Sequence, residues 1–330
     1  MADSNDDSTG NPLVELGRLL AELRYSFVCV TPETYRRQHA RRATSEAQDL
    51  RDAFGWNLPF SSTSFPERIA ALLEKAGALE RSDGSCVSKV RFSTLGNHLF
   101  VHSAYPTIEE DSVFFGPDSY RFASFIEREL SVEHAHPVKR IVDIGCGTGV
   151  GAIVARKCVP NADIVLADIN ARALSYARVN AELARCDRIE FVESDVFSAV
   201  SGTFDLVIAN PPYMMDSLAR AYRNGGEQHG AALSLRILEA SLARLNEGGR
   251  VLLYTGSAIV AGHDEFIERA RRIIVAAGLR FRYEEIDPDV FGEELDALPY
   301  RDVERIAAVG LVVYANANQT EPAMTEGIFE

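Results

Sequence analysis

The chain has 330 residues, a length that favours about two domains at a prior of roughly 150 residues each. Hydrophobic residues make up 46% and charged residues 25%, which is typical of a globular protein rather than a fibre or a membrane bundle. The formal net charge of −14 disfavours sequence-independent binding to nucleic acids or anionic membranes, because like charges repel. Compact or protein substrates are therefore favoured.

The cysteines and the N-terminal residues indicate in which cellular compartment the protein is expected. The five cysteines form an odd number without C-x-x-C spacing, so neither a disulfide framework nor a zinc knuckle is indicated. His134 and His136 lack a third ligand, so no metal site is expected. The acidic start has no signal-peptide pattern, and no window approaches the roughly 20 apolar residues of a membrane span. We expect a cytoplasmic protein without a membrane partner; the sequence carries no signal for an oligomeric state.

The first part of the chain is predicted to contain a disordered tail, residues 1–10, and an N-terminal α+β domain, residues 11–135. Leucines recur at helical spacing from Leu13 to Leu23. Further helices are predicted over residues 32–40, 65–76 and 119–130, and strands over 87–92 and 98–103. The two strands flank Leu95-Gly96-Asn97 and predict a hairpin, so the domain is expected to be winged-helix-like and to recognise the substrate or a partner. A polar, proline-containing linker at 131–137 places the domain boundary there.

The second part, residues 136–330, has a different pattern, in which short apolar runs alternate with amphipathic helices. The runs lie at residues 140–144, 164–167, 189–192, 206–209 and 251–254, with two further β-rich stretches at 281–286 and 308–314. Strands that are apolar throughout are buried on both faces, as in parallel sheets. The sequence therefore predicts an α/β domain with a doubly wound, mostly parallel sheet of seven strands.

A glycine-rich loop follows the first predicted strand of this sheet. Residues 143–149 read Asp-Ile-Gly-Cys-Gly-Thr-Gly. Glycines at such a place allow a sharp turn and a close approach of the backbone to a ligand. The loop alone also suits a tight turn without a ligand, and residues 147–152 fit the G-x-G-x-x-A pattern of nicotinamide enzymes.

Three acidic residues at successive strand ends argue against a nicotinamide cofactor. Asp143 precedes the first glycine, where a carboxylate repels a pyrophosphate but can engage an ammonium group. Asp168 ends the second strand, where it can accept both ribose hydroxyls, and Asp195 follows the third, where it can accept an adenine amino hydrogen. Each acid singly also suits a helix cap, but their joint register favours a cationic adenosyl ligand.

The fourth strand ends in Asn210-Pro211-Pro212-Tyr213, at the sheet edge where open α/β sheets bind ligands. The prolines fix the backbone and remove donors. The carbonyl of Pro211 and the side-chain oxygen of Asn210 are then acceptors for a planar –NH2 group, while Tyr213 stacks on the attached plane. The alternative is a Pro-Pro turn that closes a strand.

On these motifs the chain resembles the class I S-adenosylmethionine-dependent methyltransferases over about residues 138–316. The N-P-P-Y tetrapeptide resembles that of enzymes acting on planar nitrogens: the adenine amino group in DNA or RNA, and glutamine in release factors and a ribosomal protein. The resemblance implies a sheet whose last strand is antiparallel, S-adenosylmethionine as cofactor and S-adenosylhomocysteine as product. It implies that the cofactor-binding residues are Asp143, Gly145, Cys146, Gly147, Gly149, Asp168, Ile169, Asp195, Val196 and Asn210. It implies catalytic roles for Asn210, Pro211, Pro212 and Tyr213.

The methyl acceptor stays open between several classes. The glutamine enzymes carry a proline-rich segment before the catalytic domain, whereas this chain has Phe-Phe-Gly-Pro-Asp-Ser-Tyr at 114–120, and residues 214–226 are long enough for a substrate lid. The acidic charge favours a protein glutamine or a small metabolite as acceptor over adenine in RNA or DNA. The dense basic patch around Arg36, Arg37, Arg41 and Arg42 is explained more simply as a solvated helix face. A non-catalytic cofactor-binding scaffold is the remaining alternative, against which the intact N-P-P-Y argues.

Overall fold

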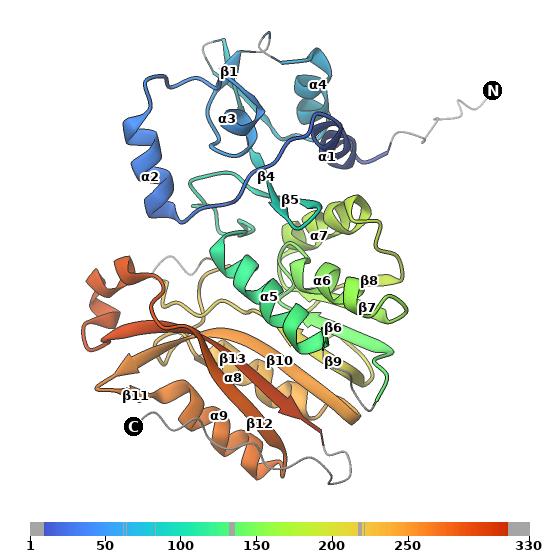
Figure 1. The fold of residues 1–330 in the computed structure, drawn as a ribbon, viewed down its shortest axis with the longest axis vertical. Coiled ribbons are helices and arrows are strands. Elements are labelled where there is room, and N and C mark those ends of the chain that lie inside the picture. Colours follow the sequence, from blue (N-terminus) through green and yellow to red (C-terminus); the bar gives the residue numbers. More distant parts are fainter. Residues whose placement is uncertain are drawn as a thin grey trace, which may run out of the picture.

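The computed structural model describes residues 10–61, 63, 65–82, 84–131, 136–216, 220 and 222–315. Figure 1 shows a smaller N-terminal part, coloured blue to cyan, beside a larger part built on one long twisted sheet. Of the predicted tail, residues 1–9 lie outside the described residues. So do residues 132–135, and the predicted boundary between residues 135 and 136 therefore stays a prediction.

The N-terminal part combines helices with two small sheets, of which one was predicted. Its helices are α1 (Pro12–Glu22), α2 (Pro32–Arg41), α3 (Leu50–Phe54) and α4 (Glu67–Lys75). Its strands are β1 (Phe60–Ser61), β2 (Leu79–Ser82), β3 (Ser85–Ser88), β4 (Val90–Leu95) and β5 (His98–Ser103). The predicted hairpin exists as β4 paired with β5, but residues 87 and 88 belong to β3. The sheet β1-β3-β2 was not predicted, because its strands are short and lack a clear apolar alternation.

The larger part contains the predicted doubly wound sheet. Among the described residues its main path has the order β12-β13-β10-β9-β6-β7-β8, and a short strand, β11, pairs with β10. The strands are β6 (Arg140–Ile144), β7 (Asp163–Asp168), β8 (Ile189–Glu193), β9 (Phe204–Ala209), β10 (Leu245–Val260), β11 (His263–Asp264), β12 (Arg280–Asp287) and β13 (Arg305–Tyr314). β13 runs antiparallel to both of its neighbours, β10 and β12. The predicted fold class, with its antiparallel last strand, is confirmed.

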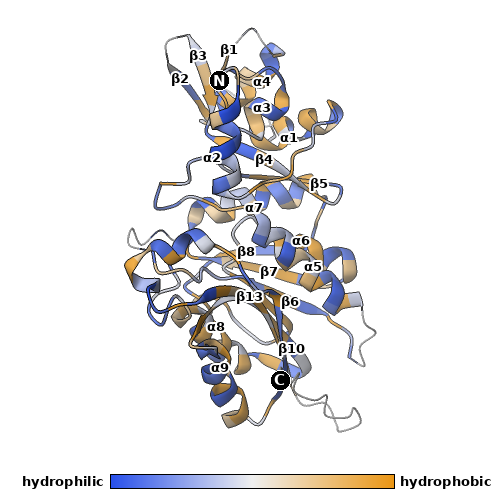
Figure 2. Cartoon of the chain, turned by 60° about the vertical axis from the view of Figure 1, so that its left-hand side comes forward, coloured by the Kyte–Doolittle hydropathy of each residue, from blue (hydrophilic) through white to orange (hydrophobic). Residues whose placement is uncertain are grey.

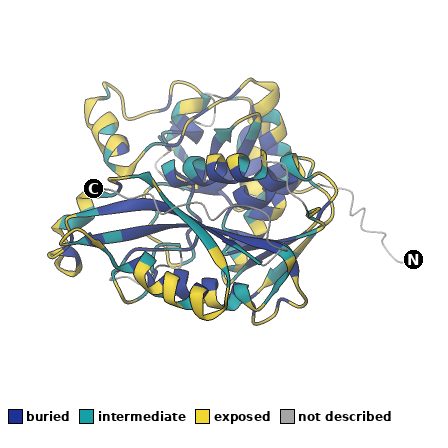
Figure 3. Ribbon diagram, turned by 60° about the horizontal axis from the view of Figure 1, so that its bottom comes forward, coloured by how far each residue is buried: buried dark blue, intermediate teal, exposed yellow. Residues whose placement is uncertain are grey.

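Helices cover both faces of this sheet. On one face lie α5 (Pro117–Ser131), α6 (Val150–Cys158) and α7 (Ala171–Leu183); on the other lie α8 (Ala232–Leu242) and α9 (Glu265–Ala276). Successive strand residues alternate between the two cores, so that Ile141 packs in the first and Val142 in the second. Figure 3 shows the buried strands between exposed helix surfaces, and Figure 2 shows the hydrophobic colouring of the strands. No helix in the described ranges is long and apolar enough to cross a membrane.

The N-terminal part is attached to the sheet mainly through α7. The side chain of Asn180 on α7 accepts a hydrogen bond from the Val101 nitrogen of β5 at 2.7 Å and donates to the Val101 carbonyl at 3.1 Å. It also donates to the carbonyl of Thr148, in the glycine loop, at 2.9 Å. Asn180 is fully buried, so these bonds form away from water. One side chain thereby fixes the N-terminal part beside the glycine loop.

Candidate active site

A cavity of about 150 Å³ lies at the carboxyl ends of the parallel strands. Its lining includes Ile144 at the end of β6, Asp168 at the end of β7 and Asn210 just after β9. The predicted site residues that line it are Asp143, Gly145, Cys146, Gly147, Asp168, Ile169, Asp195, Val196, Asn210, Pro211 and Pro212. Two predicted residues, Gly149 and Tyr213, are absent from the described lining. The sheet topology thus brings together segments that are far apart in the sequence.

The glycine loop is held against β7 by its backbone. The nitrogens of Gly145 and Cys146 donate to the carbonyl of Ala167 at 2.8 and 3.1 Å. Gly145, Gly147 and Gly149 have φ values of 68°, 53° and 76°, in the left-handed region that favours glycine. A Cβ at Gly149 would lie 3.3 Å from the Ala177 Cβ on α7. In the structure Gly149 therefore allows α6 to begin close to α7, behind the cavity wall.

Asp143 is a buried carboxylate beneath the loop, with 1% of its surface exposed. Its Oδ2 accepts the backbone N–H of Ala152 at 3.1 Å. Burial, and to a lesser degree the negative charge of Asp168, raises the pKa of Asp143 to about 7. A Cβ at Gly151 would lie 2.7 Å from the same Oδ2, so glycine is needed there for steric reasons. A cationic ligand group in the cavity would favour the ionised form of this acid.

Asp168 contacts the loop as well as the cavity. Its Oδ2 accepts the N–H of Gly147 at 2.8 Å, and its Oδ1 accepts that of Asn170 at 2.9 Å. Burial raises the pKa of Asp168, although these N–H donors act in the opposite direction. Each carboxylate oxygen keeps a second lone pair for a ligand hydroxyl. The next residue, Ile169, is 62% exposed and gives the cavity an apolar edge.

Asp195 and Val196 line the cavity after β8. The Asp195 carboxylate forms an ion pair with Arg236 of α8, and both side chains are about half exposed. Such exposed pairs contribute only about 0–1 kcal/mol, so the carboxylate stays available to a ligand amino group. This pair was not predicted from the sequence, because α8 is a separate element some 40 residues further along the chain.

Asn210 follows β9 and lines the cavity together with Pro211 and Pro212. Within the described residues, the side-chain amide of Asn210 has no hydrogen-bond partner, which leaves it available for a ligand. The following loop packs directly on the motif: a Cβ at Gly225 would lie 2.7 Å from the Pro212 carbonyl oxygen. A Cβ at Gly230 would lie 2.1 Å from the carbonyl oxygen of Tyr213. Both positions therefore exclude larger residues.

Tyr213 points away from the cavity. Its side chain is buried with 6% exposure, and its ring lies so close to Gly256 of β10 that a Cβ there would be 2.2 Å from Cδ2. The Tyr213 hydroxyl donates to the carboxylate of Asp118, at the start of α5. Asp118 lies in the 114–120 segment, and no role was predicted for it. The only signal for it in the sequence is an acid directly after Pro117, where a helix begins.

Part of the cavity wall comes from the 114–120 and 214–226 segments, whose role the sequence left open. Phe114 and Tyr222 both line it and stack on each other, with ring centroids 6.0 Å apart and planes 9° apart. The Tyr222 hydroxyl donates to the Thr107 carbonyl at 2.7 Å. These aromatic residues were not predicted as site residues, although Tyr222 lies in the 214–226 segment that was expected to be long enough for a substrate lid.

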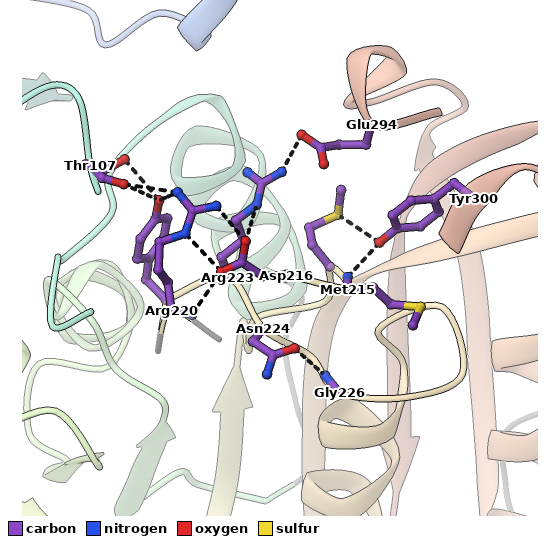
Figure 4. A network of polar contacts seen from close by, with 11 residues as sticks. Thr107, Met215, Asp216, Arg220, Arg223, Asn224, Gly226, Glu294 and Tyr300 are labelled. Carbon is purple, nitrogen blue, oxygen red and sulfur yellow. Dashed lines mark hydrogen bonds and ion pairs between the residues drawn. The ribbon is translucent and has the colours of Figure 1, made fainter. Parts of the chain in front are cut away.

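Ion pairs fix the described part of the 214–226 loop (Figure 4). Arg220 binds Asp216 with Nη2 at 2.6 Å and Nε at 2.9 Å and also donates to the Thr107 carbonyl. Arg223 pairs with Glu294 in the 3-10 helix η1 (Gly292–Asp296). The Tyr300 hydroxyl, in η2 (Leu298–Tyr300), accepts the N–H of Met215 at 2.7 Å. The loop is thus attached both to the segment before α5 and to the segment before β13.

Comparisons with known proteins identify a related family. Residues 124–263 match the family described as methyltransferase small domain. This part of the chain is similar to methyltransferase domains. S-adenosylmethionine is the cofactor of such domains, which confirms the cofactor predicted from the sequence.

Two sequence relatives and one solved structure are similar to parts of this chain. The chain is 32% identical over 171 residues to the release factor glutamine methyltransferase of Deinococcus radiodurans, covering 50% of this chain and 60% of that protein. It is 37% identical over 118 residues to the ribosomal RNA small subunit methyltransferase C of Haemophilus influenzae, covering 36% and 32%. A solved S-adenosylmethionine-dependent methyltransferase from Agrobacterium tumefaciens aligns with TM-score 0.46 and 16% identity, covering 76% of this chain and 79% of that one. The chain thus matches 60% or less of the length of these two sequence relatives.

The residues of the cavity fit S-adenosylmethionine chemically. The Asp143 carboxylate is buried beside the glycine loop and complements a cationic group, while Asp168 offers two acceptor oxygens for a ribose. Ile169 adds an exposed apolar side chain suited to one face of a base. In the parts of the chain that are described, no three His, Cys, Asp or Glu residues gather into a metal-binding group.

Proposed function

We propose that the chain is an S-adenosylmethionine-dependent N-methyltransferase that acts on a planar amide or amino nitrogen. The observation that carries the proposal is the place of Asn210. Its side-chain amide has no hydrogen-bond partner among the described residues, and it shares one cavity with Asp143 and Asp168. An acceptor site next to the cofactor site is what such a transfer requires.

In this proposal each residue has a distinct task. S-adenosylmethionine, when bound, supplies a methyl group on a positively charged sulfur. Asp143 engages the ammonium group and Asp168 the ribose, while Asp195 accepts from the adenine amino group. The side-chain oxygen of Asn210 and the carbonyl of Pro211 accept the two hydrogens of the planar nitrogen. Holding the nitrogen in place within an enclosed site provides most of the rate enhancement, without a strong base.

For the acceptor we propose a protein glutamine side chain or a small metabolite. The basic patch at α2 is compatible with this choice, because three of its four arginines form ion pairs. Arg36 and Arg37 both pair with Glu33, and Arg42 pairs with Asp52 at 2.7 Å. Together with the net charge of −14, this leaves little positive surface for a phosphate backbone. The similarity to a release factor glutamine methyltransferase points to the same acceptor class.

A second candidate is an amino group of a base in RNA, such as adenine. It is favoured by the similarity to a ribosomal RNA small subunit methyltransferase. The stacked rings of Phe114 and Tyr222 in the cavity wall are compatible with a base as well as with an amide. A non-catalytic scaffold is less consistent with an Asn210 amide that is open to the cavity.

The experiment uses methyl-labelled S-adenosylmethionine and a cell lysate separated into protein, nucleic-acid and small-molecule fractions. We expect label in the protein or small-molecule fraction, and a loss of about 100-fold or more in turnover for Asn210→Ala with little change in S-adenosylhomocysteine binding. Label mainly in RNA would select the second candidate. Binding of S-adenosylhomocysteine without label in any fraction would select the scaffold.

A further inference from the structure

We propose that Asp118 is a positioning residue of the methyl-transfer site, because it holds Tyr213 and thereby fixes Asn210, Pro211 and Pro212. This inference rests on the proposed N-methyltransferase function. It assigns Tyr213 a different task from that expected of an aromatic residue in this motif. Tyr213 anchors the motif to the protein core and does not stack on the acceptor.

The Asp118 carboxylate lies where several elements meet. It is 4% exposed and sits in the first turn of α5. It accepts hydrogen bonds from the hydroxyl of Tyr213, from the hydroxyl of Tyr254 in β10 at 3.0 Å, and from Nη1 of Arg121 at 3.1 Å. Arg121 in turn pairs with Asp287 at the end of β12, at 2.7 Å. One carboxylate therefore connects α5, β10 and, through Arg121, β12 to the residue that follows Pro212.

Buried hydrogen bonds of this kind cannot be exchanged for water without a structural change. Burial raises the pKa of Tyr213 well above its usual range, and the negative charge of Asp118 adds to this effect, so the hydroxyl stays a donor. The ring has little room to rotate, since it packs over Gly256 and meets Phe291 at a centroid distance of 6.0 Å.

The connection from Tyr213 to the acceptor groups is short and stiff. Only two prolines separate Tyr213 from Asn210, and proline fixes its own φ and restricts the residue before it. A shift of the Tyr213 side chain is therefore transmitted to the Pro211 carbonyl and to Asn210 with little loss. These are the two groups proposed to hold the acceptor nitrogen.

The variant Tyr213→Phe separates anchoring from stacking, because it keeps the ring and removes the hydroxyl. With methyl-labelled S-adenosylmethionine and the lysate fraction that the wild type labels most strongly, we expect kcat to fall by about 10- to 100-fold, as for a small misplacement of reacting groups. The KM for S-adenosylmethionine should stay unchanged. Asp118→Asn should lower kcat similarly. The kcat of the double variant should be no lower than that of the less active single variant, since both substitutions remove the same contact.

The matched control is Tyr283→Phe. The Tyr283 hydroxyl also donates to a carboxylate, that of Asp264, which caps α9 away from the cavity. This variant removes a hydroxyl of a half-buried tyrosine that makes the same kind of bond, and it should keep the wild-type kcat. If Asp118→Asn does not fold, as judged by circular dichroism, the comparison of Tyr213→Phe with Tyr283→Phe decides alone.

The outcomes are distinct. A wild-type kcat in Tyr213→Phe, or independent losses that multiply in the double variant, would overturn the anchoring role while leaving the proposed function intact. An equal loss in Tyr283→Phe would also overturn it, because the effect would then be general destabilisation. A wild type that labels no fraction would overturn the proposed function, and the role of Asp118 in it as well.

Discussion

The Asp168 carboxylate accepts the backbone N–H of Gly147 at 2.8 Å. The acid proposed to hold the ribose therefore also holds the loop proposed to surround the rest of the cofactor. The Asp168 side chain thus couples the proposed ribose site to the glycine loop. A substitution that disturbs one of them should therefore weaken cofactor binding by the other as well.

A substitution at Asp168 should therefore have a large effect on binding. For Asp168→Ala we expect the affinity for S-adenosylhomocysteine, measured by calorimetry, to fall by roughly 100-fold, because charge-assisted hydrogen bonds and the loop support are lost together. The control is Asp163→Ala at the other end of β7, where the exposed carboxylate pairs only with Arg188 in the described structure. Undiminished binding in Asp168→Ala would contradict the ribose assignment, and tight binding of NADH would revive a nicotinamide cofactor.

Cofactor binding should depend on pH through Asp143. Its pKa is raised to about 7 by burial, so near pH 6 the acid is mostly protonated and near pH 7.5 mostly ionised. Because the ionised form attracts an ammonium group, the affinity for S-adenosylhomocysteine should increase by several-fold from pH 5.5 to pH 7.5. Asp143→Asn should bind S-adenosylhomocysteine weakly, and its affinity should not change with pH over this range. If the affinity of this variant depends on pH as steeply as that of the wild type, another group causes the dependence.

Gly151 offers a steric test of the same acid. In a helix interior, Gly→Ala usually stabilises by up to about 1 kcal/mol. Here a Cβ would lie 2.7 Å from the Asp143 Oδ2 and 2.9 Å from Cε1 of Phe122. Gly151→Ala should instead destabilise by about 1–3 kcal/mol and lower cofactor affinity. Gly292→Ala, where no atom lies within 4 Å of the new Cβ, is the control; urea unfolding that shows equal effects would refute the clash.

Replacement by alanine should lower the unfolding free energy strongly at Asn180 and hardly at all at Asn210. Asn180 is buried and makes hydrogen bonds to Val101 and Thr148, so Asn180→Ala should cost about 2–4 kcal/mol of unfolding free energy. Asn210→Ala should leave the unfolding free energy within about 0.5 kcal/mol, since its amide has no partner in the described structure. Denaturant titrations of both variants measure this difference. A large loss of stability in Asn210→Ala would mean that Asn210 is structural.

The site residues at the strand ends were predictable from the sequence, whereas the tertiary contacts of Tyr213 were not. Asp143, Asp168 and Asn210 each follow a buried apolar run, and parallel strands bring their carboxyl ends to one edge, so the sequence placed these residues together. The direction of the Tyr213 ring depends on Asp118, 95 residues earlier in the chain, and on the absence of a side chain at Gly256. No local pattern encodes such a contact.

The same reason explains other differences. β10 extends far beyond the predicted residues 251–254, because its polar beginning has no apolar run and is defined by pairing with its neighbours. Arg236 binds Asp195 because tertiary packing brings a residue of α8 near the loop that follows β8. Local sequence patterns thus predict the type of secondary structure of a segment, while tertiary packing determines which residues it contacts.

The three hydrogen bonds of Asn180 also limit how the protein can be re-engineered. A chimera that replaces residues 11–135 with the corresponding part of a related protein would remove Val101, so that two of the three hydrogen bonds of the buried Asn180 amide would lose their partner. The graft would then disturb the glycine loop even though every loop residue was retained. A working exchange of the N-terminal part should therefore include α7, so that Asn180 is transferred together with the strand it binds.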